Sequence, residues 1–278
     1  MSIPIGGEPG LARAFGSPCR RDRQILPMRK VPRSRSGKPD RKNRRPPRFS
    51  RELSVLYEDD AVVVLDKPAG LPSVPIKGSD SPSALSLLSA RLAPKRQRAL
   101  VVHRIDRFTS GILVFAKTEP DREILVRQFL RHTPVRQYLA VLRGSLEARE
   151  GTLVHYFRRE GMFQKLCTER DAEAARAELR YSVERPLRGA TLVRVALATG
   201  LQNQIRTQFS AIGHPVVGDR KYHPAEASER LIARVALHAA HVQFVHPRSR
   251  ENISIDCQPP ADFQNLIQLL SPPARERR

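Results

Sequence analysis

A strict period of two in side-chain character is the feature that most limits what this chain can fold into. It runs through three segments, residues 135–142, 176–183 and 191–197. In the second segment, Ala177 and Leu179 alternate with Glu178 and Arg180. Because successive side chains of a β-strand point to opposite faces of the sheet, this period indicates half-exposed strands. Such strands are typical of antiparallel sheets.

The remaining segments after residue 53 mix helical and strand patterns. Ser81 and Pro82 predict the cap and first residue of a helix that continues to Leu92. Gly213 ends a helix expected over residues 204–212. Two more helices are expected at residues 120–130 and 263–270, and strands at 62–65, 112–116, 242–245 and 253–256. We therefore predict an α+β fold in one domain over residues 53–270: a mixed, mainly antiparallel β-sheet flanked by helices and loops.

Residues 1–50 have a different composition, rich in Pro, Gly, Ser and Arg and without periodicity. They carry 14 Lys and Arg against 3 Asp and Glu, a net +11, and the other 228 residues carry the remaining +10 of the net +21. We expect residues 1–50 to be a disordered basic arm that can hold RNA electrostatically. Excess positive charge in both parts favours a polyanionic partner, with nucleic acid first among the candidates.

The sparse cysteines and the apolar pattern indicate the compartment in which the protein acts. Cys19, Cys167 and Cys257 have no paired spacing, which argues against a disulfide framework and a zinc module and for a reducing, cytoplasmic compartment. No apolar run reaches 18 residues, so we expect no membrane span. The N-terminus lacks the apolar core of a secretory signal. We expect a monomer with no metal and no cofactor.

The loop at residues 103–111 carries the strongest chemical signal. It lies between two apolar strands and reads His-Arg-Ile-Asp-Arg-Phe-Thr-Ser-Gly. Asp106 is its one carboxylate, with His103, Arg104 and Arg107 close by in the sequence. Neighbouring positive charge should keep Asp106 ionised and able to act as a nucleophile or base. A turn-capping aspartate is the alternative that the residues alone leave open.

This loop resembles the His-Arg-Leu-Asp-x-x-Thr-Ser-Gly signature of the RluA-like pseudouridine synthases. Three further segments resemble that family in the same order: Asp66–Pro72 its Lys-Pro-x-Gly segment, Arg136–Val141 its Lys-x-Tyr strand, and Leu197–Tyr222 its long C-terminal block. The resemblance covers about residues 53–265. It implies a catalytic domain with a central RNA-binding cleft that converts uridine to pseudouridine in rRNA or tRNA.

The resemblance also implies a role for individual residues. Asp106 matches the aspartate that attacks the target nucleotide, Tyr138 the tyrosine that stacks on the uracil and assists proton removal from C5, and Arg206 the arginine that pairs with the aspartate. Arg104 matches the arginine that helps to displace the target base. The full set of expected substrate-binding residues is His103, Arg104, Arg107, Thr109, Lys67, Arg136 and Gln204.

The chain departs from the family at several positions. Leu201 and Asn203 replace an arginine and a histidine, Gln208 stands where histidine is common, and Arg136 stands where lysine is usual. These changes keep open a second function, a catalytically weak or inactive RNA-binding or assembly factor on the same fold. Residues 1–50 are too short and too polar for an S4 RNA-binding domain. This argues against the large-subunit rRNA enzymes that carry an S4 domain.

The sequence offers three other interpretations. A glycosidase would need two placed carboxylates, and the loop at residues 103–111 offers one. His238 and His241 have no third ligand at metal-binding spacing, so we predict a structural role for them. Thr199 and Gly200, before a predicted helix, indicate either a phosphate-binding helix N-terminus or a plain turn.

Overall fold

The computed structural model describes residues 53–161, 163–222 and 231–272, and the arm predicted at residues 1–50 lies outside them. The strands are β1 (Ser54–Glu58), β2 (Val62–Lys67), β3 (Leu100–Val101), β4 (Ser110–Ala116), β5 (Val135–Arg143), β6 (Glu150–Glu160), β7 (Phe163–Cys167), β8 (Ala175–Leu187), β9 (Ala190–Leu197), β10 (Leu237–Val245) and β11 (Asn252–Asp256). The helices are α1 (Ala84–Leu92), α2 (Glu119–Leu130), α3 (Gln204–Ala211) and α4 (Ala261–Leu270), with a 3-10 turn, η2 (Ala93–Lys95).

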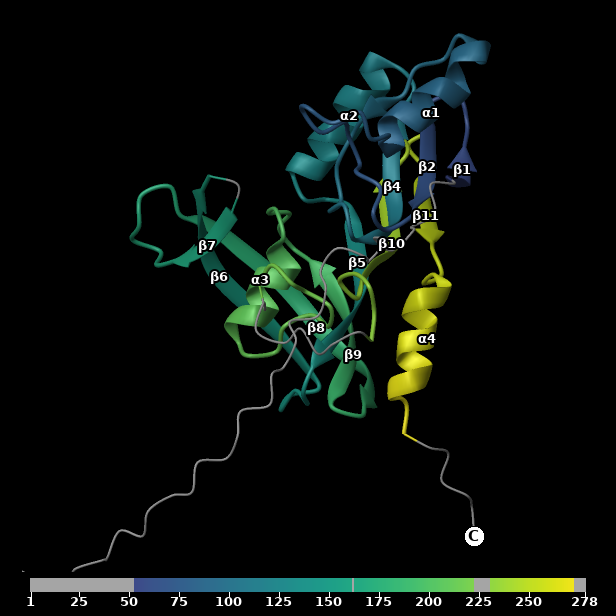
Figure 1. The fold of residues 1–278 in the computed structure, drawn as a ribbon. Helices are drawn as coiled ribbons and strands as arrows, with labels where there is room; N and C mark the ends of the chain where they lie inside the picture. Colours follow the sequence, from purple (N-terminus) through teal and green to yellow (C-terminus); the bar gives the residue numbers. More distant parts are fainter. Residues whose placement is uncertain (1–52, 162, 223–230, 273–278) are drawn as a thin grey trace, which may run out of the picture. The chain divides into compact units, whose positions relative to one another are not determined.

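Within the described residues the strands form one sheet, in the order β1-β2-β4-β10-β5-β9-β8-β6-β7 (Figure 1). The strands β3 and β11 pair with β4 and β10 beside this path. Every pairing is antiparallel except that of β4 with β10. This confirms the predicted mixed, mainly antiparallel sheet of an α+β fold. The strand β10 joins segments far apart in the sequence, because it lies between β4 and β5.

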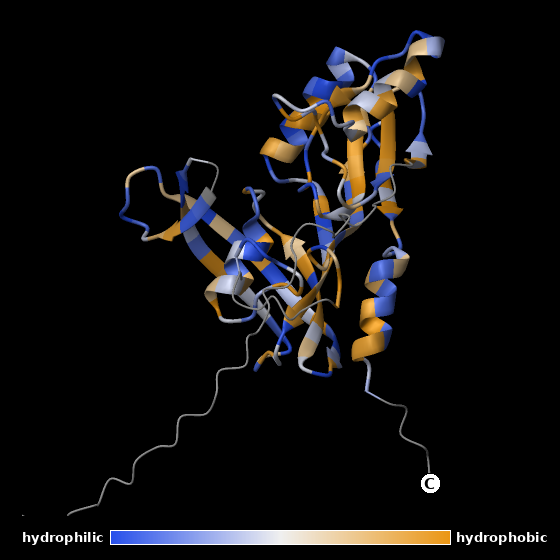
Figure 2. Ribbon diagram, viewed as in Figure 1, coloured by the Kyte–Doolittle hydropathy of each residue, from blue (hydrophilic) through white to orange (hydrophobic). Residues whose placement is uncertain are grey.

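The strands β2 and β4 are buried on both faces, which explains their unbroken apolar runs. Val62 and Val64 pack in the cluster that includes Leu125 and Phe129 of α2. Val63 and Leu65 point to the opposite face, into the cluster of α1. Figure 2 shows both strands in the colours of hydrophobic residues. The helices thus cover both faces of this part of the sheet and fix the position of the loop that precedes β4.

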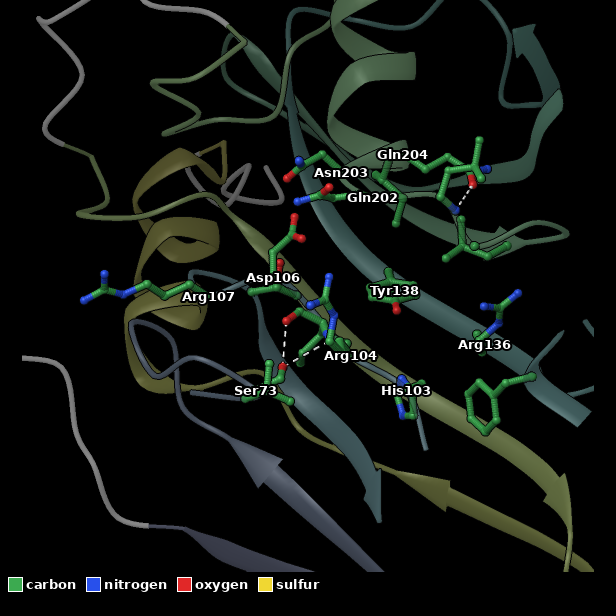
Figure 3. A pocket seen from close by; sticks show the side chains of 18 of the residues that line it. Ser73, His103, Arg104, Asp106, Arg107, Arg136, Tyr138, Gln202, Asn203 and Gln204 are labelled. Atoms are coloured by element: carbon green, nitrogen blue, oxygen red, sulfur yellow. Dashed lines mark hydrogen bonds between the residues drawn. The ribbon is translucent and has the colours of Figure 1, made fainter. Parts of the chain in front are cut away.

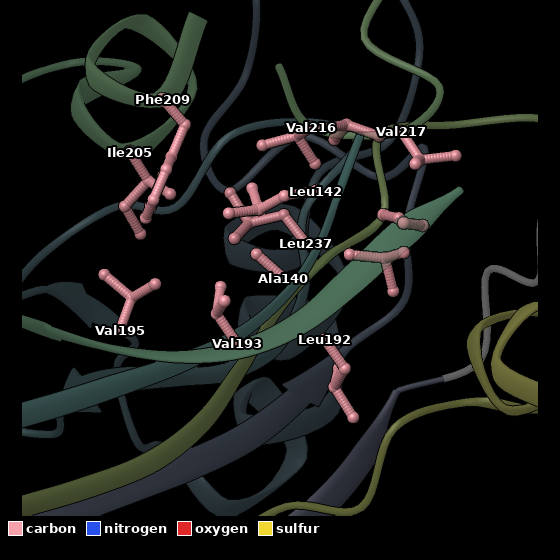
Figure 4. Close-up of a cluster of buried hydrophobic side chains, with 14 of the residues drawn as sticks. Ala140, Leu142, Leu192, Val193, Val195, Ile205, Phe209, Val216, Val217 and Leu237 are labelled. Carbon is pink, nitrogen blue, oxygen red and sulfur yellow. The ribbon is translucent and has the colours of Figure 1, made fainter. Parts of the chain in front are cut away.

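A separate core holds the other half of the sheet together. It joins β5, β8 and β9 with α3 and α4 through buried side chains such as Ala140, Val193 and Phe263. Figure 4 shows Ile205 and Phe209 of α3 facing this cluster. The predicted buried side of this helix is confirmed at these two positions, and the helix ends at Ala211, one residue earlier than predicted.

The structure corrects three details of the predicted elements. The helix α1 is capped by Ser83 rather than Ser81: Ser86 N donates to Ser83 Oγ at 3.1 Å and Ser83 N to Ser86 Oγ at 2.8 Å. This reciprocal pair is a capping box, which satisfies two backbone donors at once. The strand at 242–245 begins earlier, at Leu237. The strands β1, β6 and β7 were not predicted, and β6 shows why: Phe157 is its one buried residue, so its apolar pattern is weak.

Gly111 is expected to be intolerant of a side chain. Its φ is +104°, and an added Cβ would stand 2.2 Å from the carbonyl oxygen of Ala239 in the β4–β10 pair. We expect Gly111→Ala to lower the free energy of unfolding by about 3 kcal/mol or more, through backbone strain and overpacking. Gly189→Ala is the matched control, since Gly189 has φ +64° and open space around it. It should cost only about 1 kcal/mol. Equal losses in urea unfolding would contradict this account.

Candidate active site

The loop at residues 102–109, which carries Asp106, is held by the segment at residues 67–73. Gly70 N donates to the carbonyl oxygen of Arg107 at 2.8 Å, and Arg107 Nε returns a bond to Gly70 O at 2.9 Å. Ser73 Oγ donates to Ile105 O at 2.7 Å and accepts from Ile105 N at 3.2 Å. These bonds replace the regular pairing that the loop lacks. Two segments of the resemblance, far apart in sequence, are therefore one structural unit.

Lys67 belongs to this anchor and does not reach the substrate cleft. Its side chain is fully buried, and Nζ donates to the carbonyl oxygens of Pro68, Leu71 and Arg107 at 3.0, 2.8 and 3.2 Å. Burial lowers the pKa of Lys67 to about 7, against the opposing charge of Asp106. Three donated bonds use all three hydrogens of the ammonium form. This geometry contradicts the predicted contact of Lys67 with the substrate and makes it a positioning residue.

A cleft of about 760 Å³ opens above the Asp106 loop. Its walls come from the 72–76 segment, the 102–109 loop, the C-terminal half of α2, β5 and the segment at residues 197–206. Among the described residues that line it, Asp106 is the single carboxylate, whereas Arg104, Arg107, Arg136 and Arg206 all contribute. A cleft with this charge balance fits a polyanion, and it lacks the second carboxylate that a glycosidase would need.

Arg206 bridges two carboxylates at one side of the cleft. Its Nη1 lies 3.3 Å from Asp106 Oδ2, while Nε and Nη2 bind Asp219 in a fork at 2.6 and 2.8 Å. Asn203 Oδ1 accepts a further bond from Nη1 at 2.6 Å. Burial opposes the charge of Arg206, but Asp219 and then Asp106 raise its pKa. The predicted Asp106–Arg206 contact is present, and the tighter hold on Arg206 comes from Asp219.

Tyr138 lies on β5, between Asp106 and Arg136 in the close-up of the cleft (Figure 3). Burial raises the pKa of Tyr138 to about 12, with Arg136 opposing and Asp106 adding to the shift. The phenol therefore keeps its proton near neutral pH. It can present a flat ring to a nucleobase and donate a hydrogen bond. To accept a proton from the substrate, the phenol must first pass its own proton to another group.

The predicted substrate-binding residues of the loop differ in what they face. Arg104 is exposed and lines the cleft. Arg107 is directed away from the other labelled side chains in Figure 3, and its Nε donates a hydrogen bond to Gly70 O. Thr109 is buried at the cleft wall, and its hydroxyl has no hydrogen-bond partner in the described part of the chain. Of the three, Arg104 is the best placed to meet an incoming nucleotide.

His103 does not provide the positive charge that the sequence suggested. Its ring stacks on Phe129, with centroids 4.4 Å apart, and Nε2 accepts a bond from Val114 N at 3.1 Å. Burial, together with the charge of Arg136, lowers the pKa of His103 to about 3. The ring is therefore neutral at physiological pH. It packs the loop against α2 and leaves the positive charge to the arginines.

Gln204 and Gln208, on α3, are committed to the protein itself. Gln204 Oε1 accepts from Thr199 Oγ1 and Leu201 N, both at 2.9 Å, and its Nε2 donates to Glu178 O at 3.0 Å. Its amide thus shapes the turn before α3, while the residue also lines the cleft, so its contact with substrate stays a prediction. Gln208 is fully buried and donates to carbonyl oxygens of β6 and β8, so this departure from the family lies outside the cleft.

Two residues of the site were not predicted. Asp219 lay within the quoted C-terminal block, but nothing in its sequence neighbourhood links it to Arg206. Asn203 has φ +55°, a left-handed conformation that asparagine tolerates better than most side chains. Its αL backbone and its bond to Arg206 explain how an amide fits at this position. The positive φ could have been anticipated from asparagine before a helix, but the contact could not.

His238 and His241, for which the sequence predicts a structural role, have partners within the protein. His238 is buried, its Nε2 donates to Cys257 O at 2.9 Å and its Nδ1 accepts from Ser110 Oγ at 2.9 Å. His241 pairs with Asp256 at 2.9 Å.

None of the helices in residues 53–161, 163–222 and 231–272 has the length and apolar character of a membrane span.

Comparison with known proteins shows the class of enzyme to which this fold belongs. The chain belongs to the RNA pseudouridylate synthase family, whose model matches residues 61–211. This family isomerises uridine to pseudouridine in RNA, so the protein is an RNA pseudouridine synthase of the RluA-like type, an isomerase.

Individual relatives are similar over most of the chain. The ribosomal large subunit pseudouridine synthase D of Zymomonas mobilis is 34% identical over 230 residues, which cover 78% of this chain and 73% of that protein. The dual-specificity RNA pseudouridine synthase RluA of Vibrio cholerae is 35% identical over 205 residues, 71% of this chain and 79% of its own. The human RNA pseudouridylate synthase domain containing 4 has a similar fold, with TM-score 0.64 at 21% identity over 77% of this chain and 91% of that structure.

Asp219→Asn is expected to impair catalysis by releasing Arg206. The amide keeps the shape but loses the charge that holds Arg206 Nε and Nη2, and hydrogen bonds between charged groups contribute about 1.5–3 kcal/mol. We expect kcat to fall about tenfold or more with a smaller change in KM. The matched control is Glu184→Gln, which breaks an exposed pair with Arg194 and should change neither constant. An unchanged kcat in Asp219→Asn would show that Asp219 does not position Arg206.

Stability at acid pH is expected to report on His103. Its folded pKa of about 3 lies below the unfolded value of about 6.5, so between these values the unfolded chain binds a proton that the folded chain does not. The free energy of unfolding should therefore fall as the pH drops from about 6.5 towards 3. His103→Gln should make this fall shallower in urea unfolding measured across that range. An identical pH slope in the variant would place the dependence on other groups.

Proposed function

We propose that this enzyme isomerises uridines of ribosomal or transfer RNA, with Asp106 as its nucleophile. The observation that carries the proposal is the charge balance of the cleft, in which Asp106 is the single carboxylate among the described lining residues. Arg206 holds Asp106 Oδ2 at 3.3 Å, and Tyr138 lies beside it. A held nucleophile next to a flat ring in a cationic cleft suits an extruded base.

The chemistry balances without water or a cofactor. The Asp106 carboxylate forms a bond to the target nucleotide as the bond between the ribose and uracil N1 breaks. The detached uracil turns, its C5 bonds to the ribose carbon, and the carboxylate is released. The proton lost from C5 is matched by one gained at N1. The product is an isomer of the substrate, as the enzyme class requires.

Tyr138 and Arg104 have separate roles in this proposal. Because the pKa of Tyr138 is raised to about 12, its ring serves first as a stacking platform for the uracil. Its hydroxyl assists removal of the C5 proton by relaying that proton rather than by standing as a phenolate. Arg104 is exposed at the cleft. It fills the space that the extruded base leaves in the RNA stack, or it binds the phosphate of the extruded nucleotide.

The class of RNA is supported by the relatives, one named for the large ribosomal subunit and one for dual specificity. All three proposed catalytic residues come from one chain, so a monomer would contain a complete site. We place its action in the cytoplasm, where rRNA and tRNA are available to it. The altered residues Leu201 and Asn203 leave the Asp106–Arg206 contact intact, which favours an active enzyme over a purely RNA-binding factor.

Asp106→Asn and Asp106→Ala are expected to abolish turnover while RNA binding persists. Neither replacement can attack the nucleotide, and no second carboxylate lines the described cleft, so the loss should be complete. Tyr138→Phe should keep binding and slow turnover. The assay is tritium release from RNA labelled at uridine C5, made from rRNA and tRNA of cells that lack the gene, alongside binding of the same RNA.

The matched control is Asp80→Asn, because Asp80 is exposed and outside the cleft. It should release tritium at the wild-type rate. Substantial turnover by Asp106→Ala would remove Asp106 as the nucleophile. A wild-type protein that binds these RNAs and leaves every uridine unchanged would favour the RNA-binding factor instead.

A further inference from the structure

The cleft continues past Tyr138 to a second basic position, Arg136. Both residues lie on β5, two positions apart and therefore on the same face, with about 7 Å between their Cα atoms. Figure 3 shows Arg136 and Asp106 on opposite sides of Tyr138. The target uracil, stacked on Tyr138, would occupy the Asp106 side. The Arg136 end is then free for another part of the RNA.

Arg136 carries a half-buried charge without a carboxylate partner among the described residues. Its one hydrogen bond there is from Nη2 to the carbonyl oxygen of Thr199, at 3.3 Å. Its Nε is buried and bonds to nothing in the described chain. Burial lowers the pKa of Arg136, so the charged form is poorly solvated in the absence of RNA. Buried charges are normally paired, and an anion bound here would supply the missing partner.

The walls around Arg136 fit a nucleotide. Val126, Phe129 and Leu130 of α2 line the cleft. Leu197, at the end of β9, and Leu201, before α3, line it as well. Leu130 is 74% exposed although it is a large apolar residue. Apolar and aromatic surfaces beside an arginine are the usual surroundings of single-stranded RNA, in which the base packs and the phosphate pairs.

Gly200 leaves room for the guanidinium. A Cβ at this position would stand 2.7 Å from Arg136 Nη1. The glycine of the turn and the arginine of β5 are therefore fitted to each other. Leu201, at the position where the family has an arginine, adds apolar surface to this side of the cleft.

We propose that the Arg136 end of the cleft binds the phosphate of a nucleotide adjacent to the target uridine, with that nucleotide's base or ribose against the apolar wall. The proposal rests on the proposed function, because it takes the uracil to be stacked on Tyr138. The RNA chain is continuous, so a neighbouring phosphate must lie within one nucleotide of the bound uridine. Arg136 thus acts in substrate binding and register rather than in the chemical step.

The test is binding of oligouridylate, a single-stranded RNA in which every base is a possible target, followed by fluorescence anisotropy across a salt series. We expect Arg136→Gln to weaken binding about tenfold and to reduce the slope of log Kd against log salt by about 0.7, the value for one phosphate of a single strand. Arg136→Lys should retain the slope and lose part of the affinity, since it keeps the charge without the fork. Gly200→Ala should weaken binding by crowding the guanidinium.

A second probe separates the phosphate from the base. On an oligouridylate with uncharged methylphosphonate linkages, wild type and Arg136→Gln should bind equally, because the group that Arg136 recognises is gone. The control variant is Arg122→Gln, an exposed arginine of α2 that pairs with Glu119 away from the cleft. It should match wild type on both probes.

An Arg136→Gln protein with the wild-type affinity and salt slope would overturn the proposal. If this variant does not fold, Arg136→Lys and Gly200→Ala carry the test, and wild-type affinity in both would also overturn it. Failure of the proposed function is a separate result, seen as tritium that stays on the labelled RNA with the wild-type enzyme. Loss of binding by Arg136→Gln would stand in that case as evidence for a phosphate site without the isomerisation.

Discussion

The hydrogen bonds donated by the buried Nζ of Lys67 are the interaction on which the position of Asp106 depends. They join the turn after β2 to the loop before β4 through carbonyl oxygens of Pro68, Leu71 and Arg107. A lysine buried among apolar strands would be costly if any of its hydrogens lacked an acceptor. Here each has one, and the backbone of the catalytic loop is fixed in return. The side chain of Asp106 can then face the cleft while its main chain stays in place.

The second constraint is the chain of opposite charges around Arg206. Asp219, fully buried, takes two of its donors, and Asp106, partly exposed, takes a longer bond. Arg206 is therefore fixed by the protein and only lightly bound to the nucleophile. This division lets the guanidinium orient Asp106 without using both of its oxygens. The remaining oxygen is available to the nucleotide.

Much of the fold and part of the site could be predicted from the sequence. Alternation in β5, β8 and β9 predicted the antiparallel sheet. The burial of β8 follows this alternation, whereas residues 140–142 of β5 and 190–193 of β9 are buried at consecutive positions. Asp106 and Arg206 were paired through their motifs, and the structure places them in contact. The assignment of Asp106, Tyr138 and Arg206 to catalysis remains a prediction, supported by their convergence at one cleft.

What the sequence could not supply was the direction in which polar side chains point. Lys67 and Gln204 look like ligands for RNA in the linear chain, yet their polar atoms bond to protein atoms. His103 lines the cleft, but its ring stacks on Phe129 and accepts a bond from Val114 N. Asp219 looks like a turn residue and is the main partner of Arg206. These roles depend on contacts between segments distant in sequence. Local periodicity carries no information about such contacts.

The insertion of β10 between β4 and β5 has a consequence for how the chain acquires its shape. The strands β4 and β5 are made long before residues 237–245, and until β10 arrives each has one edge without its final partner. Apolar edges of this kind invite pairing with other chains, and such non-local closure is slow. During synthesis the catalytic loop and α3 would exist as separate pieces. Assembly of the complete cleft therefore waits until residues 237–245 have been made.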